Sequence, residues 1–355
     1  MLYLSLTFDY ELFLGKNSAT EKDILFEPTA QLAKMLSEEN VSATFFADIC
    51  SAIQYRKMGI EEYAAEFEKQ LQELYASGQD VQLHIHPHWL KSVYAEGDWK
   101  FDYASYRIHS FGFERRKANN AYDVLQTGTE RLNTILREVD NNYQCIAYRA
   151  GGFALQPHKE LVEALYDSGI RVDSSVAPHL SSDSKMNFYN YENKHIQGNW
   201  WISPDHEWWE DMPQKPKAIY EIPIATENKN PVLFALRRTL KPETIKLPRQ
   251  QMKGTYVNTE EGKSKQINIW KYLSGYTAIS LDAYQAGFLY EQILRYYKKH
   301  ECGKKDVFAA VIGHPKLVTD AYVQNAKKLI EMTRMNGNIK IMSIHDIYQQ
   351  AICRL

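Results

Sequence analysis

The sequence predicts an α/β fold, specifically a distorted (β/α) barrel of seven or eight parallel strands with two long insertions. Strand-like apolar segments alternate with helix-like segments along the 355 residues, as in parallel sheets covered by helices. Polar residues follow several of these segments, at the end of the strands where a barrel builds its site. Two irregular stretches, at about 177–218 and 225–281, interrupt the alternation. We therefore expect one domain spanning 1–355, with a doubly wound open sheet as the alternative.

Apolar and β-prone runs predict strands at 2–8, 41–47, 81–85, 145–148, 171–173, 219–224, 307–312 and 339–343. Helical periodicity with start and stop signals predicts helices at 29–39, 61–77, 121–139, 157–168, 280–300, 319–335 and 344–352. Residues 90–117 are aromatic and charged without a clear period, which predicts a long loop.

The composition excludes several classes of protein. Apolar residues make up 44% and charged residues 24%, as in globular proteins, and the net charge of −2 predicts no nucleic-acid partner. We expect no membrane span, because no run approaches the roughly 18 apolar residues that one needs. The first residues lack the features of a signal peptide, and the four cysteines are scattered, so we expect a cytoplasmic protein with reduced thiols.

Three histidines, His84, His86 and His88, lie within five residues at the end of one predicted strand. If the chain stayed extended, the first and third would lie roughly 13 Å apart. If it curls after Ile85, residues four apart come within about 6 Å on one face. The spacing therefore favours His84 and His88 as metal ligands, with His86 in a structural or supporting role. A polar turn whose histidines cap backbone groups is the alternative.

Other polar residues follow the ends of other predicted strands. Asp9 and Glu11 share a face because side chains alternate along a strand. Arg149, Asp173 and His314 each come at the end of a further strand. Alone, each is more typical of a cap, a turn or a structural ion pair, but their joint placement favours an enzyme.

The strand-end segments resemble the motifs of the polysaccharide deacetylases of the NodB-homology type, a group of metal-dependent carbohydrate esterases. The similar segments, within about 1–180 and 305–345, are Thr7-Phe8-Asp9, the histidines of His84-x-x-x-His88, Tyr148-Arg149-Ala150-Gly151-Gly152, Val172-Asp173-Ser174-Ser175-Val176 and Gly313-His314-Pro315.

The resemblance implies a role for each matching residue. Asp9 would be the general base, held by Arg149, and His314 the general acid. His84 and His88 would bind a divalent metal ion, for which we expect zinc. The family's second aspartate is replaced by Tyr10, and Glu11 is the nearest substitute as a third ligand.

The expected function is hydrolysis of the N-acetyl group of a sugar or glycan. Because the chain is expected to be cytoplasmic, an intermediate of surface-glycan synthesis fits better than a mature polymer. A small-molecule amidohydrolase acting on a formamide or ureide would use the same site, and a catalytically dead glycan-binding protein is a further alternative.

The two insertions have distinctive compositions. Residues 198–211 hold four of the seven tryptophans, and we expect Trp200, Trp201 and also Trp89 to stack on sugar rings, with burial in the core as the alternative. Residues 237–271 hold only three glutamates but nine basic residues, namely Arg237, Arg238, Lys241, Lys246, Arg249, Lys253, Lys263, Lys265 and Lys271. This excess could contact a substrate phosphate or, peripherally, an anionic membrane surface, whereas a solvated loop is the simpler interpretation.

Overall fold

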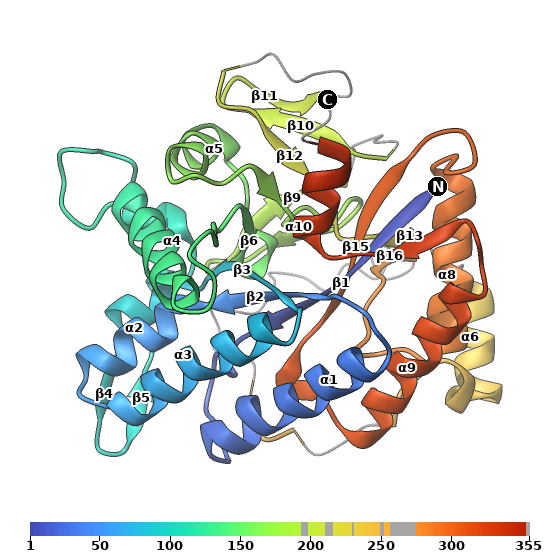
Figure 1. Ribbon diagram of the computed structural model, residues 1–355, viewed down its shortest axis with the longest axis horizontal. Coiled ribbons are helices and arrows are strands. Elements are labelled where there is room, and N and C mark those ends of the chain that lie inside the picture. Colours follow the sequence, from blue (N-terminus) through green and yellow to red (C-terminus); the bar gives the residue numbers. More distant parts are fainter. Residues whose placement is uncertain (193–197, 210–215, 229–230, 249–251, 256–274, 353–355) are drawn as a thin grey trace.

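The computed structural model describes residues 1–192, 198–209, 216–228, 231–248, 252–255 and 275–352, and confirms the predicted α/β class (Figure 1). A curled sheet forms its centre, in the order β11-β10-β12-β7-β6-β3-β2-β1-β15, with β16 beside the start of β1. The parallel strands are β1 (Leu2–Tyr10), β2 (Thr44–Asp48), β3 (Asp80–Ile85), β6 (Ala147–Ala150), β7 (Val172–Asp173), β12 (Ile219–Glu221), β15 (Val307–Gly313) and β16 (Ile339–Ile341). Two antiparallel strands, β10 (Trp200–Ser203) and β11 (His206–Trp209), extend one edge.

The chain after β12 brings the two ends of the parallel sheet together. The Ala225 N–H donates to the Ala310 carbonyl at 2.8 Å, and the Ala310 N–H donates to the Pro223 carbonyl at 2.8 Å. These bonds set the segment after β12 beside β15, so the parallel strands curl into a distorted barrel. The C-terminal ends of the parallel strands therefore converge at one end of the barrel, which is the end where barrel enzymes have their active sites.

Helices pack around the outside of this sheet (Figure 1). They are α1 (Glu27–Glu38), α2 (Ile49–Lys57), α3 (Glu61–Ala76), α4 (Ala121–Arg137), α5 (His158–Asp167), α8 (Ala286–Lys299), α9 (Asp320–Arg334) and α10 (Ile344–Ile347). The start of α4 is fixed by a capping box between Asn120 and Asp123. Sequence analysis missed α2, a short helix that begins directly after the β2 strand and carries little amphipathic signal.

The region expected to be a loop, 90–117, contains short ordered elements. A hairpin of β4 (Val93–Ala95) and β5 (Asp98–Lys100) is flanked by 3₁₀ turns at Pro87–Lys91, Tyr103–Ser105 and Ile108–Phe111. Such short elements give no readable periodicity, which is why the sequence did not reveal them.

The second insertion leaves the barrel after β12 and returns to it before α8. It contains β13 (Thr226–Asn228), α6 (Pro231–Leu240), a 3₁₀ turn at Pro242–Thr244 and β14 (Tyr276–Ala278). On its return, the Leu281 N–H donates to the Ile312 carbonyl at 2.9 Å, and the Ile312 N–H donates to the Ile279 carbonyl at 3.2 Å. This pairing places Asp282 beside the C-terminal end of β15. The first insertion holds β8 (Ser181–Asp183), β9 (Phe188–Asn190), β10 and β11.

Among the described residues, no helix has both the length and the hydrophobicity to cross a membrane.

Alternation at the end of β1 places Asp9 and Tyr10 on opposite faces of the sheet. Tyr10 points outward to α3, where its ring lies 5.0 Å from that of Phe67 and its hydroxyl donates to Gln70 Oε1 at 2.7 Å. Asp9 and Glu11 point to the other side. Tyr10 is therefore a core residue, and position 10 cannot supply a ligand to a site shared by its two neighbours.

We expect Tyr10→Phe to reduce the free energy of unfolding by about 1 kcal/mol, since it removes one buried hydrogen bond. Tyr10→Asp should cost several kcal/mol (~3–5), because it buries an unpaired carboxylate among apolar side chains. Urea unfolding of both variants measures this. If Tyr10→Asp were as stable as the parent, residue 10 would not face the core.

Candidate active site

A buried ion pair joins the ends of β1 and β6. Arg149 Nη1 donates to Asp9 Oδ1 at 2.7 Å, and the guanidinium is fully buried. The same Nη1 donates to Thr7 Oγ1 at 2.8 Å, while Nε and Nη2 donate to the carbonyl and hydroxyl of Ser174 at 2.8 and 2.9 Å. The Phe46 ring packs 4.2 Å from the guanidinium carbon. Arg149 is thus held rigidly and contacts only one oxygen of Asp9.

The second oxygen of Asp9 faces the centre of the site. Burial alone would raise the pKa of Asp9, but Arg149, together with His84 and His314, lowers it below its ordinary value. Asp9 is therefore a carboxylate at neutral pH. Its Oδ2 lies 3.7 Å from His314 Nε2, so this atom is placed to accept a proton from a molecule bound between them.

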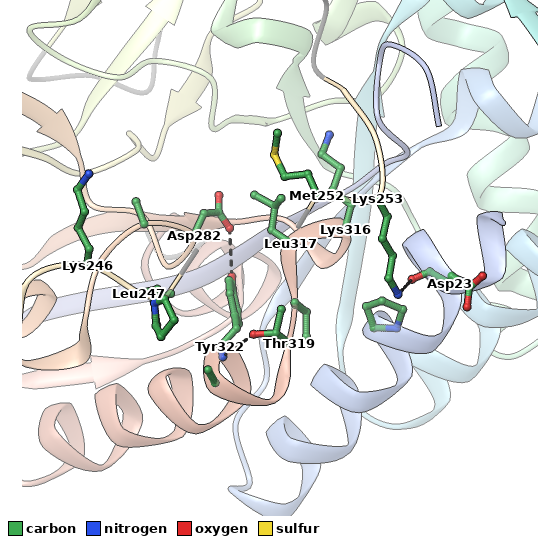
Figure 2. A pocket seen from close by; sticks show the side chains of 15 residues that line it. Asp23, Lys246, Leu247, Met252, Lys253, Asp282, Lys316, Leu317, Thr319 and Tyr322 are labelled. Atoms are coloured by element: carbon green, nitrogen blue, oxygen red, sulfur yellow. Dashed lines mark hydrogen bonds between the residues drawn. The ribbon is translucent and has the colours of Figure 1, made fainter. Parts of the chain in front are cut away.

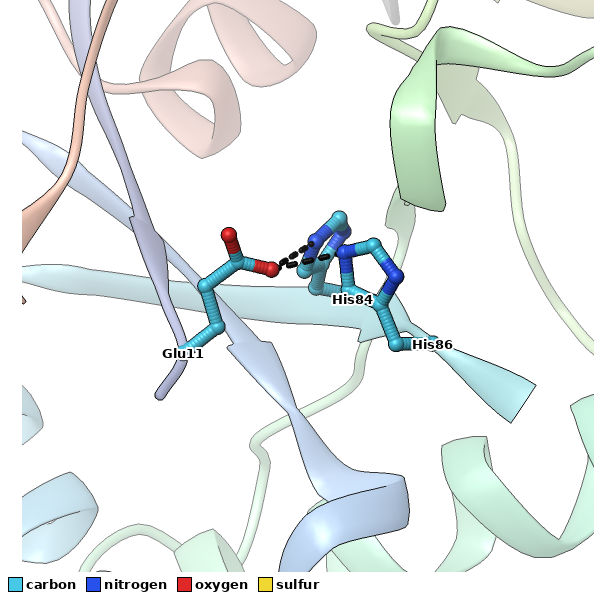
Figure 3. Close-up of side chains that lie close together, drawn as sticks. All are labelled: Glu11, His84 and His86. Carbon is cyan, nitrogen blue, oxygen red and sulfur yellow. Dashed lines mark hydrogen bonds and ion pairs between the residues drawn. The ribbon is translucent and has the colours of Figure 1, made fainter. Parts of the chain in front are cut away.

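Glu11, His84 and His86 form a cluster in which one carboxylate oxygen meets two imidazoles (Figure 3). Glu11 Oε2 lies 3.1 Å from His84 Nε2 and 2.7 Å from His86 Nε2. All three side chains are buried, and one potential ligand atom from each lies within 4.8 Å of the others. Two histidines and one carboxylate are a ligand set for a divalent ion that leaves further coordination positions open.

Neighbouring groups hold both histidines in place. His84 Nδ1 lies 2.8 Å from the Arg149 carbonyl, a contact that requires an N–H at Nδ1, so Nε2 is the ring nitrogen that faces Glu11 and that could bind an ion once it is deprotonated. The backbone N–H of His86 donates to Asp48 Oδ1 at 3.0 Å, which fixes the chain at this residue. A Cβ at Gly151 would lie 2.7 Å from His86 Nδ1, so only glycine allows the end of β6 to approach this ring.

The cluster fits a bound cation in spacing and in charge. A tetrahedral ion with bonds near 2.0–2.1 Å separates its ligand atoms by about 3.3 Å, so the oxygen–nitrogen distances of 3.1 and 2.7 Å need to open by roughly 0.2 and 0.6 Å. Burial lowers the pKa of His84, but Asp9 and Glu11 raise it to about 9, because the two carboxylates attract positive charge to this place. A divalent ion would supply the same charge.

Lys316 stabilises Glu11 from the opposite side. Its buried ammonium donates to Glu11 Oε1 at 2.6 Å and to the Leu12 carbonyl at 3.1 Å. Burial alone would raise the pKa of Glu11, whereas Lys316, His86 and His84 lower it well below its ordinary value. Glu11 therefore stays ionised, with Oε1 bound to lysine and Oε2 directed at the two imidazoles.

The structure places His86, rather than the expected His88, in this cluster. The chain stays extended through His86 and turns only at Pro87, so His84 and His86 lie on one face as alternate residues of a strand. His88 lies instead among the rings of Trp89, Phe101 and Tyr106. Burial and the nearby His86 hold its pKa well below the ordinary value, so His88 is neutral. We accordingly revise the ligand set to Glu11, His84 and His86.

His314 lies across the site from the imidazole cluster. Its Nε2 is 3.7 Å from both Asp9 Oδ2 and Glu11 Oε1, and its Nδ1 is 2.7 Å from Asp282 Oδ2. The backbone N–H of His314 also donates to Asp282 Oδ1 at 2.9 Å. Burial disfavours the imidazolium, yet Asp282 and Asp9 raise the pKa of His314 above its ordinary value. The raised pKa favours the charged imidazolium of His314, and its Nε2 faces the carboxylates of Asp9 and Glu11.

The three predicted sugar-stacking tryptophans lie elsewhere. Trp89 and Trp200 are buried in the core, with 0% and 1% of their surface exposed. Trp201 is half-buried and packs edge-on against Tyr220, in a cluster with Tyr3 and residues near the strand starts, opposite the site. Their rings fill the core instead of forming a platform, which was the alternative for these residues.

Asp173, noted at a strand end, is also buried away from the centre, where its carboxylate accepts from the Ser175 hydroxyl at 2.7 Å. Sequence reasoning missed Asp48, Lys316 and Asp282 as members of the site. Asp48 is the last residue of β2 and lies beside His84. Its position directly after the predicted strand 41–47 was a signal that could have identified it. Lys316 lies in a turn and Asp282 directly follows the second insertion, where no local pattern marks either residue.

The fold and the cluster together define an α/β barrel protein with a candidate two-histidine, one-carboxylate metal centre. No protein-family model and no curated protein matches the chain. Among solved structures it is similar to the 4-alpha-glucanotransferase from Thermococcus litoralis (10% identity, 98% of this chain, 40% of that chain, TM-score 0.51), a likeness of fold alone. It also matches a protein assigned as a polysaccharide deacetylase from Mycobacterium smegmatis (12% identity, 99% and 91% coverage, TM-score 0.49). A third match is Puue allantoinase (12% identity, 99% and 91% coverage, TM-score 0.47).

The revised ligand set makes a direct prediction. We expect His86→Ala to lose most of its bound zinc after dialysis, because it removes one of three ligands, while His88→Ala keeps it. Metal analysis of the folded variants, with thermal unfolding as a check on folding, measures this. The opposite result, retention by His86→Ala and loss by His88→Ala, would restore the pair expected from the sequence spacing.

Proposed function

We propose that this protein is a metal-dependent hydrolase that removes the N-acetyl group of a sugar. The observation that carries this proposal is the arrangement of two proton-transfer groups, Asp9 and His314, on either side of the Glu11, His84 and His86 cluster. The resemblance of the strand-end motifs to polysaccharide deacetylases supports the same reaction.

Amide hydrolysis needs a proton acceptor for the attacking water and a proton donor for the leaving amine. Glu11, His84 and His86 would hold the divalent ion, which supplies Lewis acidity that activates water and polarises a carbonyl. Asp9, ionised beside Arg149, accepts the proton of the water through Oδ2, the oxygen that faces His314. Arg149 positions this carboxylate and keeps it charged.

The leaving nitrogen of an amide must be protonated before it departs as an amine. His314 is suited to this step, since Asp282 favours its charged form and its Nε2 faces the centre. After donation, the neutral imidazole keeps its Nδ1–H bonded to Asp282. The base and the acid are therefore different residues, each with its own charged partner.

The preferred substrate is an N-acetylated sugar on a biosynthetic intermediate for a surface glycan, handled in the cytoplasm. Amidohydrolysis of a formamide or ureide uses the same groups and is the competing activity.

A panel assay tests the reaction. We expect the zinc-loaded protein to release acetate from N-acetylated sugars, to stop after treatment with a chelator, and to recover on adding Zn²⁺. Allantoin and a formylated amino sugar serve as the competing substrates. Release from either of these without any acetate from acetylated sugars would replace the deacetylase with the small-molecule amidohydrolase, and no turnover on any would favour a glycan-binding protein.

The acid role of His314 can be separated from a structural one. We expect His314→Ala to lower kcat about 10²- to 10⁴-fold, the usual contribution of a general acid, with zinc content unchanged. Asp282→Asn removes the charge that raises the pKa of His314, so the acid form is lost at lower pH. The alkaline limb of the kcat/KM profile should therefore move to lower pH. An unmoved limb in Asp282→Asn would show that His314 is not the titrating acid.

A further inference from the structure

The described basic residues of the second insertion lie outside the catalytic cluster. Lys246 and Lys253 line a cavity of about 310 Å³ beside the active site (Figure 2), where the Lys253 ammonium donates to the Asp23 carbonyl at 3.0 Å. Arg237 is bound to Glu291 at 2.8 Å. Five further basic residues lie outside the described part of the chain, wholly or by their side chains, namely Arg238, Arg249, Lys263, Lys265 and Lys271. The buried charges that support the site come from the strands of the barrel.

A pair of buried carboxyl groups lies behind Arg149. Asp173 ends β7 and Glu221 ends β12, and the two residues are register partners in neighbouring parallel strands. Both are 0% exposed. Two carboxylates at this separation in the interior would repel each other and lose their hydration, so the pair needs a specific arrangement of protons and donors.

The hydrogen bonds of the pair indicate where its proton lies. Asp173 accepts twice from Ser175, at 2.7 Å from the hydroxyl and at 3.0 Å from the backbone N–H. Glu221 Oε1 accepts from the Val176 N–H at 3.1 Å. Glu221 Oε2 is buried, and no N–H or hydroxyl of the described residues donates to it, whereas the Asp173 carboxyl lies within hydrogen-bond reach. Two carboxyl groups bond to each other only if one carries a proton, and the donors around Asp173 leave that proton on Glu221.

The electrostatic surroundings agree with this assignment. Burial, together with the neighbouring Asp173, raises the pKa of Glu221 well above its ordinary value. Burial also raises the pKa of Asp173, but the bonds from Glu221 and Ser175 and the charge of Arg149 oppose that shift. Tyr148 and Tyr191 are the other titratable groups near the pair, and burial raises the pKa of each, so both are neutral. The pair therefore carries one negative charge, on Asp173.

The same pair holds the turn that grips Arg149. Asp173 and Glu221 bind the consecutive backbone N–H groups of residues 175 and 176. The residue before them, Ser174, accepts from Arg149 Nε through its carbonyl at 2.8 Å and from Nη2 through its hydroxyl at 2.9 Å. A shift of this turn would therefore move the guanidinium that binds Asp9.

We propose that Glu221 is a positioning residue of the active site, a neutral acid that donates to Asp173 and, with it, holds the turn at 174–176 that orients Arg149 toward Asp9. The consequence for catalysis rests on the proposed deacetylase function, but the proton on Glu221 and the restraint of Arg149 do not. Glutamine can make the same bonds, since its carbonyl oxygen can accept from Val176 and its N–H can donate to Asp173. Leucine fills a similar volume and makes neither bond.

Two spectroscopic measurements test the arrangement without any substrate. The infrared difference spectrum of the parent minus Glu221→Gln at neutral pH should contain the carbonyl stretch of a protonated carboxylic acid. By nuclear magnetic resonance, the Arg149 Nε–H should exchange with solvent at least about tenfold faster in Glu221→Leu than in the parent, and at the parent's rate in Glu221→Gln. Glu68→Gln removes a carboxylate bound to Arg56 and Arg131 among the outer helices, and should change neither measurement.

The kinetic test separates positioning from a general loss of stability. Glu221→Leu should lower kcat for acetate release about tenfold or more, with KM and zinc content near those of the parent, because buried hydrogen bonds that orient Arg149 are lost. Glu221→Gln should keep kcat within about twofold of the parent, since its bonds are preserved.

A missing acid band, or an Arg149 Nε–H that exchanges equally fast in Glu221→Leu and the parent, would overturn the proposal. A large loss of kcat in Glu221→Gln would overturn it too, and this outcome decides the matter even if Glu221→Leu does not fold. A parent protein that releases no acetate but gives both expected spectroscopic results would reject the reaction and retain the positioning role of Glu221 toward Arg149.

Discussion

Two carboxylates buried two residues apart at the C-terminal end of β1 are the constraint on which the site depends. Asp9 and Glu11 would repel each other and resist burial, so each requires a compensating cation. Arg149 from the end of β6 neutralises Asp9, and Lys316 from the turn after β15 neutralises Glu11. The ion pairs therefore form only when strands on both sides of β1 have taken their places in the barrel, which links assembly of the site to completion of the fold.

The two cations also give the two carboxylates different surroundings, because each cation binds only one oxygen of its carboxylate. Arg149 binds Asp9 Oδ1 and leaves Oδ2 facing His314, whereas Lys316 binds Glu11 Oε1 and leaves Oε2 facing two imidazoles. Identical functional groups thereby obtain different neighbours, one suited to accept a proton and the other to hold an ion. Tyr10 separates them along the chain but faces the core, so the different surroundings of Asp9 and Glu11 arise from residues distant in the sequence, on β6 and in the turn after β15.

The order of strands and helices was predictable because each buried strand and each amphipathic helix leaves a local pattern. For the same reason Asp9, Glu11, Arg149 and His314 could be located from their positions after strands. The sequence spacing favoured His88 as the partner of His84, whereas the structure places His86 beside it. The difference arises because the sequence does not reveal whether the chain turns before or after His86. Asp282 and Lys316 could not be located, because their roles depend on contacts with His314 and Glu11 that no local spacing encodes. The tryptophans were predicted to stack on sugars, but Trp89 and Trp200 are buried in the core. Aromatic composition alone does not distinguish a binding surface from a core.

The second insertion contributes to the site as well as extending from the barrel. Its last residues pair with β15, and that pairing positions Asp282 against His314. The hydroxyl of Tyr322, at the start of α9, also donates to Asp282 at 3.4 Å, so the returning insertion and a helix of the barrel together fix this carboxylate. Because Asp282 raises the pKa of His314, a change in the insertion that displaces Asp282 would also change the charge state of this imidazole.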